Sequence, residues 1–549
     1  MKNFIGVCKW RLRVRSAMIW TVSKSAMAGV LPILLFVGCK SSDDDTLKIL
    51  SFNDFHGQYV ADYDIAGAAR LVSAIEQQKN AVVLCGGDNF SGTYFSRVTN
   101  NYLGNELYKR CGVKYSCIGN HEFDWGIDTL IYFATKGNIT YLSANIFTDS
   151  TMTVRPYWLK PYVIEQHKLS SGRDVKVAII GLTTIKTKTS TKTSGTKTTF
   201  FANPYPATRE IMELLKDSAD VYIILAHIGM SMKDGQPTFD MGENADSLPY
   251  IKGVNAIIAA HSHNVVMGYI NEVPVVEAGC YGNYIGVIRL DLNAHTSAVE
   301  ILPTAGAKPN GDMEKSVEKI IADPRFNLSE TLAVAEQEIP YDYTSKAQES
   351  TELGAMVATA YSDKFKELAL DAAGSKIIIG LSNFGAIRVP LEKGNITMVK
   401  AGNVLPFGGE LQAYEVTGKE LKAFFNYGIF GTAAEKRGML QSHNLEITVK
   451  DGSVAQIRYI SPDSDFGGNG GGAPARDNAR VIADNDRVII VAESFLLTGG
   501  DGYPKINTRP IEAFKSIPSE KKDPTIAFAD YLRSKKNIWL NTAVKCKIL

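Results

Sequence analysis

The sequence has no excess of charge of either sign. Lysine and arginine together number 59 and aspartate and glutamate 58, so the formal net charge is +1. Aromatic residues are not interleaved with basic ones and no basic stripe is visible, so we expect no nucleic-acid polymer as a partner. Hydrophobic residues make up 45% of the chain, as in soluble globular proteins. Its 549 residues are too many for one core, so we expect two or three domains.

Cysteine is scarce, and no pair has the CxxC spacing of a metal or redox motif. Of the seven cysteines, Cys8 and Cys39 lie in the N-terminal leader, and the others are Cys85, Cys111, Cys117, Cys280 and Cys546. Five is an odd number, so no complete disulfide framework is implied. A Cys111–Cys117 bridge is one interpretation, but apolar surroundings favour buried free thiols.

The apolar run near the N-terminus, Ala26–Gly38, is too short to span a membrane comfortably. It follows a stretch, residues 1–24, that is rich in lysine and arginine, and this order is typical of a secretory signal. Gly38-Cys39 resembles a bacterial lipobox, in which Cys39 would be the lipidated first residue of the mature protein. We therefore expect a signal peptide and lipobox over residues 1–39 and a polar tether over residues 40–46.

The acidic end of this tether resembles the surface-export tag of some outer-membrane lipoproteins, although a flexible tether needs no such role. The expected location is the cell envelope after export across the inner membrane, with a lipid anchor in the outer membrane. The periplasmic and the surface face both stay open. The membrane would be a partner through this anchor alone, and nothing in the sequence predicts an oligomeric state.

Five apolar runs are each followed by Asp, Asn or His. Apolar runs without alternation predict strands that are covered on both faces and that alternate with helices, such as the one expected over Ala66–Lys79. In α/β folds of this kind the working site lies outside the carboxyl ends of the strands. We therefore expect the polar residues to converge. The runs are Leu47–Phe52 before Asp54 and His56, Ala81–Cys85 before Asp88, Tyr115–Ile118 before Asn120, Val221–Leu225 before His227, and Val254–Ala260 before His261 and His263.

This set mixes imidazole with oxygen ligands, which suits zinc, manganese or iron better than calcium. Seven ligands are too many for one tetrahedral ion but enough for two ions that share a carboxylate. Two divalent ions with two aspartates leave the site cationic, so it would attract a phosphate and lower the pKa of a bridging water. Two metals about 3.5–4 Å apart can hold both the nucleophile and the phosphate oxygens. The sequence thus predicts metal-assisted phosphoester hydrolysis.

The ordered motifs, above all Asn53-Asp54-Phe55-His56-Gly57 and Gly119-Asn120-His121-Glu122-Phe123-Asp124, resemble those of the calcineurin-like metallophosphoesterases. The layout from about Leu47 to near the C-terminus resembles the secreted 5′-nucleotidase/UDP-sugar hydrolase family. This resemblance implies an α/β (α+β) chain, with an N-terminal two-sheet sandwich and a C-terminal α/β substrate domain. It implies two divalent metal ions, zinc or manganese, as cofactors.

The resemblance also implies a role for each residue. His121, oriented by Asp124, would stabilise the transition state or protonate the leaving alkoxide. Family members often carry Gln in place of His263. One metal would be held by Asp54, His56 and His263, the other by Asn120, His227 and His261, and Asp88 would bridge the two.

We expect a metallophosphoesterase domain over residues 47–303, a linker with a hinge helix over 304–340 and a nucleotide-binding domain over 341–549. In the family, three loops of the last domain form the nucleotide pocket. Carried over, Phe407 and Phe495 would stack on the base, gaining about 1–3 kcal/mol. Asn383 would hydrogen-bond the base, Asp501 the ribose hydroxyls, and Arg388 the phosphate.

Two residues depart from the family pattern. Phe384 stands where the family has glycine, and the helix at Leu353-Gly354 is preceded by Lys346 instead of a phosphate-binding arginine. The expected reaction is phosphate release from nucleoside 5′-monophosphates. The alternatives are a 2′,3′-cyclic nucleotide, a 3′-nucleotide or a nucleotide-sugar pyrophosphate as substrate, or a surface protein that binds without catalysis. Ile185–Thr199, rich in Lys, Thr and Ser, is expected to be an exposed loop.

Overall fold

A computed structural model describes most of the chain after the leader. The expected signal peptide and lipobox, the tether up to residue 44, and Lys346 lie outside the described residues. Within the described part, no helix is both long enough and apolar enough to cross a bilayer. The described residues are 45–62, 65–136, 139–191, 193–240, 242–342, 350–431, 439–461, 479–506, 509–540 and 545–549.

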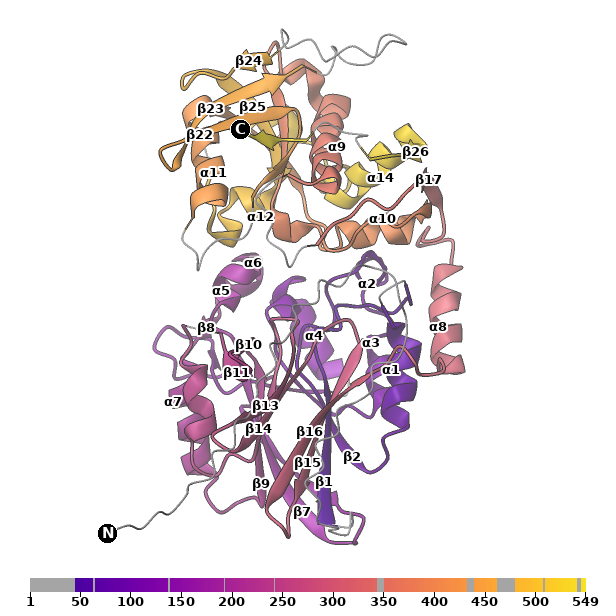
Figure 1. Cartoon of the computed structure of the whole chain (residues 1–549), viewed down its shortest axis with the longest axis vertical. Helices are drawn as coiled ribbons and strands as arrows, with labels where there is room; N and C mark the ends of the chain where they lie inside the picture. Colours follow the sequence, from indigo (N-terminus) through magenta and orange to yellow (C-terminus); the bar gives the residue numbers. More distant parts are fainter. Residues whose placement is uncertain are drawn as a thin grey trace, which may run out of the picture. The chain divides into compact units, whose positions relative to one another are not determined.

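Two six-stranded sheets pack face to face in the N-terminal half (Figure 1). The first sheet has the order β16 (Thr296–Pro303), β15 (Tyr284–Asp291), β1 (Thr46–Phe52), β2 (Ala81–Cys85), β3 (Tyr115–Cys117) and β4 (Thr140–Leu142). The second has the order β13 (Val265–Ile270), β14 (Val273–Ala278), β12 (Ala256–Ala259), β9 (Val221–His227), β7 (Asp174–Thr183) and β6 (Tyr162–Lys168). The expected two-sheet sandwich is therefore confirmed.

The inner strands are apolar without alternation because both of their faces are covered. On β1, Leu47 and Ile49 belong to the core between the two sheets, whereas Leu50 and Phe52 belong to the core under the helices. Helices α1 (Gly67–Glu76) and α3 (Gly104–Cys111) lie outside the first sheet, and α7 (Pro204–Leu214) lies outside the second (Figure 1). The central strands β1, β2 and β3 run parallel, so their carboxyl ends share one edge.

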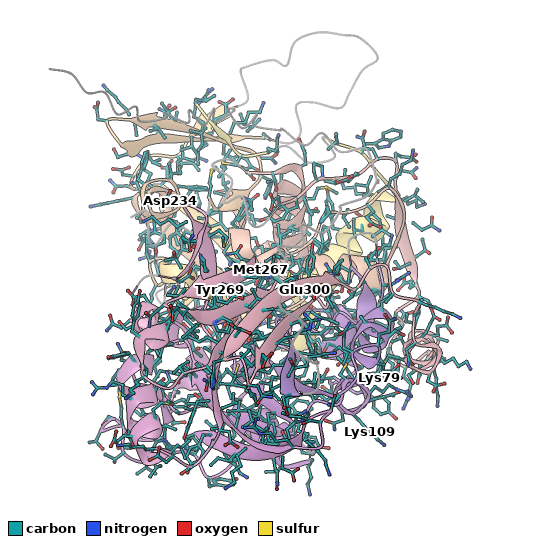
Figure 2. The ribbon with its side chains drawn as sticks, turned by 60° about the horizontal axis from the view of Figure 1, so that its bottom comes forward. Lys79, Lys109, Asp234, Met267, Tyr269 and Glu300 are labelled. Atoms are coloured by element: carbon teal, nitrogen blue, oxygen red, sulfur yellow. The ribbon has the colours of Figure 1, made fainter. Side chains whose placement is uncertain are left out.

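Unlike the inner strands, the edge strand β13 alternates between buried and exposed side chains. Val266 is buried, whereas Met267 and Tyr269 are 48% and 42% exposed. Figure 2 shows both side chains beside Glu300 of β16. Alternation thus appears where only one face of the sheet is covered.

The C-terminal half is built from three smaller sheets and four longer helices. The helices are α9 (Glu352–Ala369), α10 (Met398–Val404), α11 (Gly418–Phe430) and α14 (Pro524–Lys535). The sheets have the orders β20 (Leu411–Thr417), β25 (Arg487–Glu493), β18 (Ile378–Ser382), β21 (Gln441–Ser442); β24 (Ala479–Val481), β23 (Ser453–Ile460), β22 (Leu445–Lys450), β27 (Lys547–Ile548); and β19 (Gly394–Thr397), β17 (Thr331–Ala335), β26 (Asn537–Ile538).

Local signals account for several boundaries here. Thr417 and Glu420 form a capping box at the start of α11. The helix expected within residues 304–340 is α8 (Gly311–Ile321). Strand β17 also lies within residues 304–340, and it pairs with β19 and β26 of the C-terminal half.

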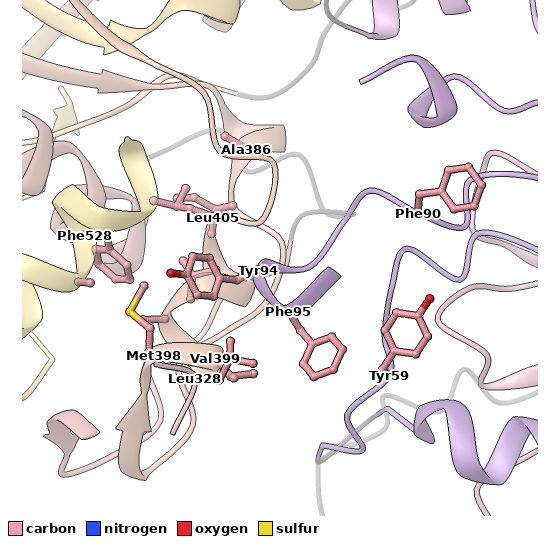
Figure 3. Close-up of a cluster of buried hydrophobic side chains, with 14 of the residues drawn as sticks. Tyr59, Phe90, Tyr94, Phe95, Leu328, Ala386, Met398, Val399, Leu405 and Phe528 are labelled. Atoms are coloured by element: carbon pink, nitrogen blue, oxygen red, sulfur yellow. The ribbon is translucent and has the colours of Figure 1, made fainter. Parts of the chain in front are cut away.

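One hydrophobic cluster contains residues from both halves. Figure 3 shows Tyr94 of α2 (Tyr94–Val98) beside Met398 of α10 and Leu405. A Cβ on Gly402 would lie 2.1 Å from the Cβ of Tyr94, so α10 approaches α2 too closely for any larger residue. Arg97 of α2 also donates to Thr525 Oγ1 (2.8 Å).

The expectation that Ile185–Thr199 is an exposed loop is wrong. It contains the short helices α5 (Thr187–Ser190) and α6 (Thr193–Thr196), and Thr187, Thr191 and Thr199 are buried. Burial is feasible because the hydroxyls find local acceptors, as when Thr187 Oγ1 donates to Thr184 O (2.7 Å). Composition alone does not reveal those bonds.

The cysteine expectation is confirmed for four residues. Cys85, Cys111, Cys117 and Cys546, all within the described residues, are buried free thiols. The Cys111–Cys117 bridge is therefore not formed.

Candidate metal centre and substrate cavity

The seven predicted ligands lie at the carboxyl ends of five strands from both sheets. Asp54 and His56 follow β1, Asp88 follows β2, Asn120 follows β3, His227 ends β9, and His261 and His263 follow β12. The structure brings Asp54, His56 and His263 into one group and Asp88, His227 and His261 into another. In each group the potential ligand atoms lie within 4.8 Å of one another.

The backbone at these strand ends is strained. Asp54, His56, Asp88, His261 and His263 all have positive φ, between 49° and 86°. Non-glycine residues adopt this left-handed region at a cost of about 1–2 kcal/mol each. Such strain is concentrated at functional sites, where the surrounding structure imposes it.

In the first group, two imidazoles face each other. His56 Nε2 lies 3.0 Å from His263 Nε2. His56 Nδ1 lies 2.7 Å from the carbonyl of Ser91, so Nδ1 carries the proton and Nε2 presents its lone pair. Burial, and then the nearby His263, lower the pKa of His56 to about 3, which keeps the ring neutral.

The Asp54 carboxylate completes this group. Its Oδ2 accepts bonds from Asn53 Nδ2 (2.7 Å) and His261 N (2.9 Å), whereas Oδ1 accepts none from the described residues. Burial opposes ionisation of Asp54, but His263 and His227 outweigh it and lower the pKa to about 2. A buried anionic oxygen beside an imidazole lone pair fits a divalent cation.

The second group centres on His227. Its Nε2 lies 3.1 Å from Asp88 Oδ2 and 3.3 Å from Asn120 Oδ1, and its Nδ1 lies 2.7 Å from Gly86 O. Burial opposes charge on His227, but Asp88 outweighs it and raises the pKa to about 10. Burial, and then His227, lower the pKa of His261 to about 3. With its raised pKa, His227 carries a second ring proton when no metal is bound. A divalent ion bound at His227 Nε2 would replace the proton there, so the second group also fits a divalent ion.

Two buried glutamates hold the ligand loops, and the sequence analysis assigned a role to neither. Glu122 accepts from the backbone N–H groups of Asp88 and Asn89 (both 2.8 Å) and Gly119 (2.7 Å). Burial, and then Asp88, raise the pKa of Glu122 to about 7. Glu277 accepts from the backbone N–H groups of Met230 and Ser262, and so fixes the turn between His261 and His263. The available signal was a lone charge in the apolar strand Val273–Ala278.

His121 and Asp124 form the expected pair. His121 Nδ1 lies 2.7 Å from Asp124 Oδ2, and the backbone N–H of His121 donates to Asp88 Oδ1 (2.7 Å). Burial lowers the pKa of His121, but Asp124 and Asp88 outweigh it, so the pKa is raised. The ring stacks on Phe407, with centroids 5.0 Å apart and planes at 9°.

A cavity of about 290 Å³ adjoins this pair, and all five predicted substrate residues line it. Asn383 Nδ2 donates to Asp501 Oδ2 (2.8 Å), and Asn383 Oδ1 accepts no hydrogen bond from the described residues. The Arg388 guanidinium lies 4.7 Å from the centre of the Phe407 ring. Phe495, the last of the five predicted substrate residues, also lines the cavity. Glu493, for which the sequence predicted no role, is a further lining residue.

The departure at Phe384 has a structural explanation. Its side chain is 2% exposed, and its ring packs against Tyr341 with centroids 5.0 Å apart. The ring therefore contributes to the core under this loop.

Comparison with known proteins agrees with this geometry. Residues 47–265 match the model for calcineurin-like phosphoesterases, and residues 331–508 match the model for the 5′-nucleotidase C-terminal domain. The chain belongs to the 5′-nucleotidase family of the calcineurin-like metallophosphoesterases. A 5′-nucleotidase of Vibrio cholerae is 22% identical over 552 residues, covering 89% of this chain and 92% of the relative.

Some relatives are much longer than this chain. Endonuclease YhcR of Bacillus subtilis is 27% identical over 464 residues, which cover 76% of this chain but 36% of the relative. This chain thus spans about a third of that protein's length. The crystal structure of a 5′-nucleotidase precursor from Thermus thermophilus superposes with a TM-score of 0.70 at 20% identity, covering 92% and 99% of the two chains. This likeness confirms the two-part fold.

The match to calcineurin-like phosphoesterases and the two candidate ligand groups both support metal-dependent phosphoester hydrolysis as the chemistry of this site.

Proposed function

We propose that this hydrolase releases phosphate from nucleoside 5′-monophosphates. The observation that carries the proposal is a single cavity lined by His121, Asp124 and several candidate metal ligands together with Asn383 and Arg388. A metal centre and a nucleoside-sized recess with aromatic walls are thus open to the same ligand.

The proposed cofactors are two divalent ions, zinc or manganese. Bound ions would supply positive charge toward the phosphate and lower the pKa of a water. The neutral His56 and His261 rings and the ionised Asp54 support this assignment. The proposed sets are Asp54, His56 and His263 for one ion, Asn120, His227 and His261 for the other, and Asp88 between them.

The chain's own residues orient the substrate and move the proton. With His121 Nδ1 held by Asp124, the Nε2 side of the ring is left to protonate the departing 5′-oxygen. Arg388 would hold the phosphate by charge-assisted hydrogen bonds. Phe407 and Phe495 would stack on the base, Asn383 Oδ1 would accept from it, and Asp501 would accept from the ribose hydroxyls.

Another phosphoester in the same cavity is the second candidate. The observation that favours it is Phe384, which lines the cavity with Asn383 and Arg388 at a position where the family resemblance implies a glycine. A 2′,3′-cyclic nucleotide, a 3′-nucleotide or a nucleotide-sugar pyrophosphate would use the same metal centre.

The boundaries 47–303, 304–340 and 341–549 are proposed as domain limits, with β17 of the linker completing a sheet of the C-terminal domain.

Export with a lipid anchor at Cys39 is proposed as the route to the cell envelope. The motif before Cys39 supports the anchor. Labelling with a tagged fatty acid tests it, because Cys39→Ser should abolish the label.

The decisive experiment measures phosphate release from a panel of 5′-, 3′- and 2′,3′-cyclic nucleotides and a nucleotide sugar, after chelation and reloading with manganese or zinc. We expect Asp88→Asn to lose metal and activity, and His121→Ala to keep metal but lose most turnover. Exposed Asp128→Asn is the matched control. Normal turnover by Asp88→Asn, or no metal-dependent release from any substrate, would refute the proposal.

A further inference from the structure

Ser190 and Thr191 reach the candidate active site from the Lys/Thr/Ser-rich segment. Thr191 Oγ1 donates to Asp124 Oδ1 (2.7 Å), and Asn120 Nδ2 donates to Ser190 O (3.1 Å). Thr191 is 4% exposed, so its hydroxyl is withdrawn from bulk water. Adjacent residues of one segment thus contact both the His–Asp pair and an amide of the metal centre.

The bond from Thr191 acts on the orientation of Asp124. The two oxygens of this carboxylate have different partners: Oδ2 faces His121 Nδ1 and Oδ1 accepts from Thr191. A carboxylate held at both oxygens cannot rotate about its Cβ–Cγ bond without losing a hydrogen bond. The direction of the His121 ring therefore depends on Thr191 as well as on Asp124.

The bond to Ser190 acts on Asn120. Because the amide nitrogen donates to a carbonyl, the amide oxygen must be the atom that faces His227 Nε2. An oxygen is what a metal ion accepts from an asparagine side chain. The same short stretch of backbone therefore sets which end of this amide faces the centre.

The segment itself is held firmly. Thr184 Oγ1 donates to Glu243 Oε1 (2.6 Å) and Ile185 N donates to Glu243 Oε2 (2.9 Å). Lys188 Nζ donates to the carbonyls of Thr196 (2.7 Å) and Thr199 (3.0 Å) and closes the segment on itself. These bonds hold in place the segment that carries the Thr191 hydroxyl.

We propose that Thr191 is a positioning residue for the His121–Asp124 pair, acting through its hydroxyl on the second oxygen of Asp124. This inference rests on the proposed function, in which a water oxygen bonds to phosphorus, the bond from phosphorus to the 5′-oxygen breaks, and the departing 5′-oxygen takes its proton from His121. Thr191 acts through Asp124 and keeps the proton donor aimed at the reacting atoms.

The test compares Thr191→Val, which keeps the shape but removes the hydroxyl, with Thr191→Ser, which keeps the hydroxyl. Thr189→Val is the matched control, because Thr189 is exposed and its hydroxyl bonds to Lys186 O in the same segment. Each variant is assayed with a nucleoside 5′-monophosphate and with p-nitrophenyl phosphate, whose leaving group departs without a proton. Metal content and melting temperature are recorded for every variant.

We expect Thr191→Val to lower kcat for the nucleotide roughly 10–100-fold, the usual effect of losing a second layer of hydrogen bonds. KM, metal content and the rate with p-nitrophenyl phosphate should stay close to wild type. Thr191→Ser should restore kcat, Thr189→Val should be unchanged, and adding Thr191→Val to His121→Ala should cost nothing more.

Three results would overturn the inference. These are a normal kcat for Thr191→Val, an equal loss with both leaving groups, and a further loss when Thr191→Val is added to His121→Ala. Failure of the proposed function looks different, because the wild-type protein itself would then show no metal-dependent phosphate release from the nucleotide.

Discussion

Replacing Glu122 with glutamine should weaken the metal centre although Glu122 is not a candidate ligand. Its carboxylate accepts three backbone N–H bonds, from Asp88 and Gly119 at Oε2 and from Asn89 at Oε1. A glutamine has one amide oxygen, so at least one of these donors must face an NH₂ group. The loops that carry Asp88 and Asn120 then lose a common anchor.

The expected change in the free energy of unfolding follows from the three hydrogen bonds that Glu122 accepts. One unsatisfied buried donor costs about 1–3 kcal/mol, and two bonds that change from a charged to a neutral acceptor lose about 1 kcal/mol each. The lost bonds in Glu122→Gln sum to about 3–5 kcal/mol. The neutral amide also avoids the burial cost that raises the pKa of Glu122, so the free energy of unfolding should fall by less than this sum. Glu122→Ala leaves all three donors unsatisfied and should lower it by about 3–9 kcal/mol.

Calorimetric melting and a metal titration at pH 8 measure both effects, since Glu122 with a pKa of about 7 is then ionised. We expect melting temperature and metal affinity to fall from wild type to Glu122→Gln to Glu122→Ala. The exposed Glu318→Gln on α8 is the control and should change stability by no more than about 0.5 kcal/mol. Wild-type melting and metal affinity in Glu122→Gln would refute the reasoning.

Three further outcomes are expected. Chelation should abolish phosphate release and added manganese or zinc should restore it; release that survives complete metal removal contradicts the proposed cofactors. Gly119→Ala should lose metal with little change in circular dichroism, because its Cβ would lie 2.1 Å from Asp88 Oδ1; a wild-type metal content would show that the loop can move. Burial lowers the pKa of His443 from 6.5 to about 3, so between these pH values the unfolded chain binds a proton that the folded chain does not. His443 should therefore contribute a loss of about 1.4 kcal/mol per pH unit to the free energy of unfolding as the pH drops below 6.5. His443→Gln should remove this contribution, which urea titrations at pH 7 and pH 5 measure; an unchanged pH dependence excludes it.

The strand-end motifs were readable from the sequence because they are local. An apolar run that is buried on both faces, followed at once by Asp, Asn or His, specifies which side chains leave the sheet at its carboxyl edge. The capping box at Thr417 and Glu420 is readable for the same reason, since both of its bonds join residues three positions apart.

The segment Ile185–Thr199 shows where prediction from local sequence fails. Its composition predicted exposure because threonine and serine are usually at the surface. Whether they are buried depends on partners elsewhere in the chain, and Thr191 has one in Asp124, 67 residues away. Glu277 was missed for the same reason, since its backbone donors lie 15 and 47 residues away.

The sequence by itself determined which side chains stand at the ends of the strands and hence the chemistry that they can perform. Only the tertiary structure decided that His56 and His263, 207 residues apart, face each other across 3.0 Å, and which buried carboxylates hold their loops. The physical reason is that hydrogen bonds and close approaches between distant segments depend on how sheets pack and loops close, and no local pattern of residues encodes them.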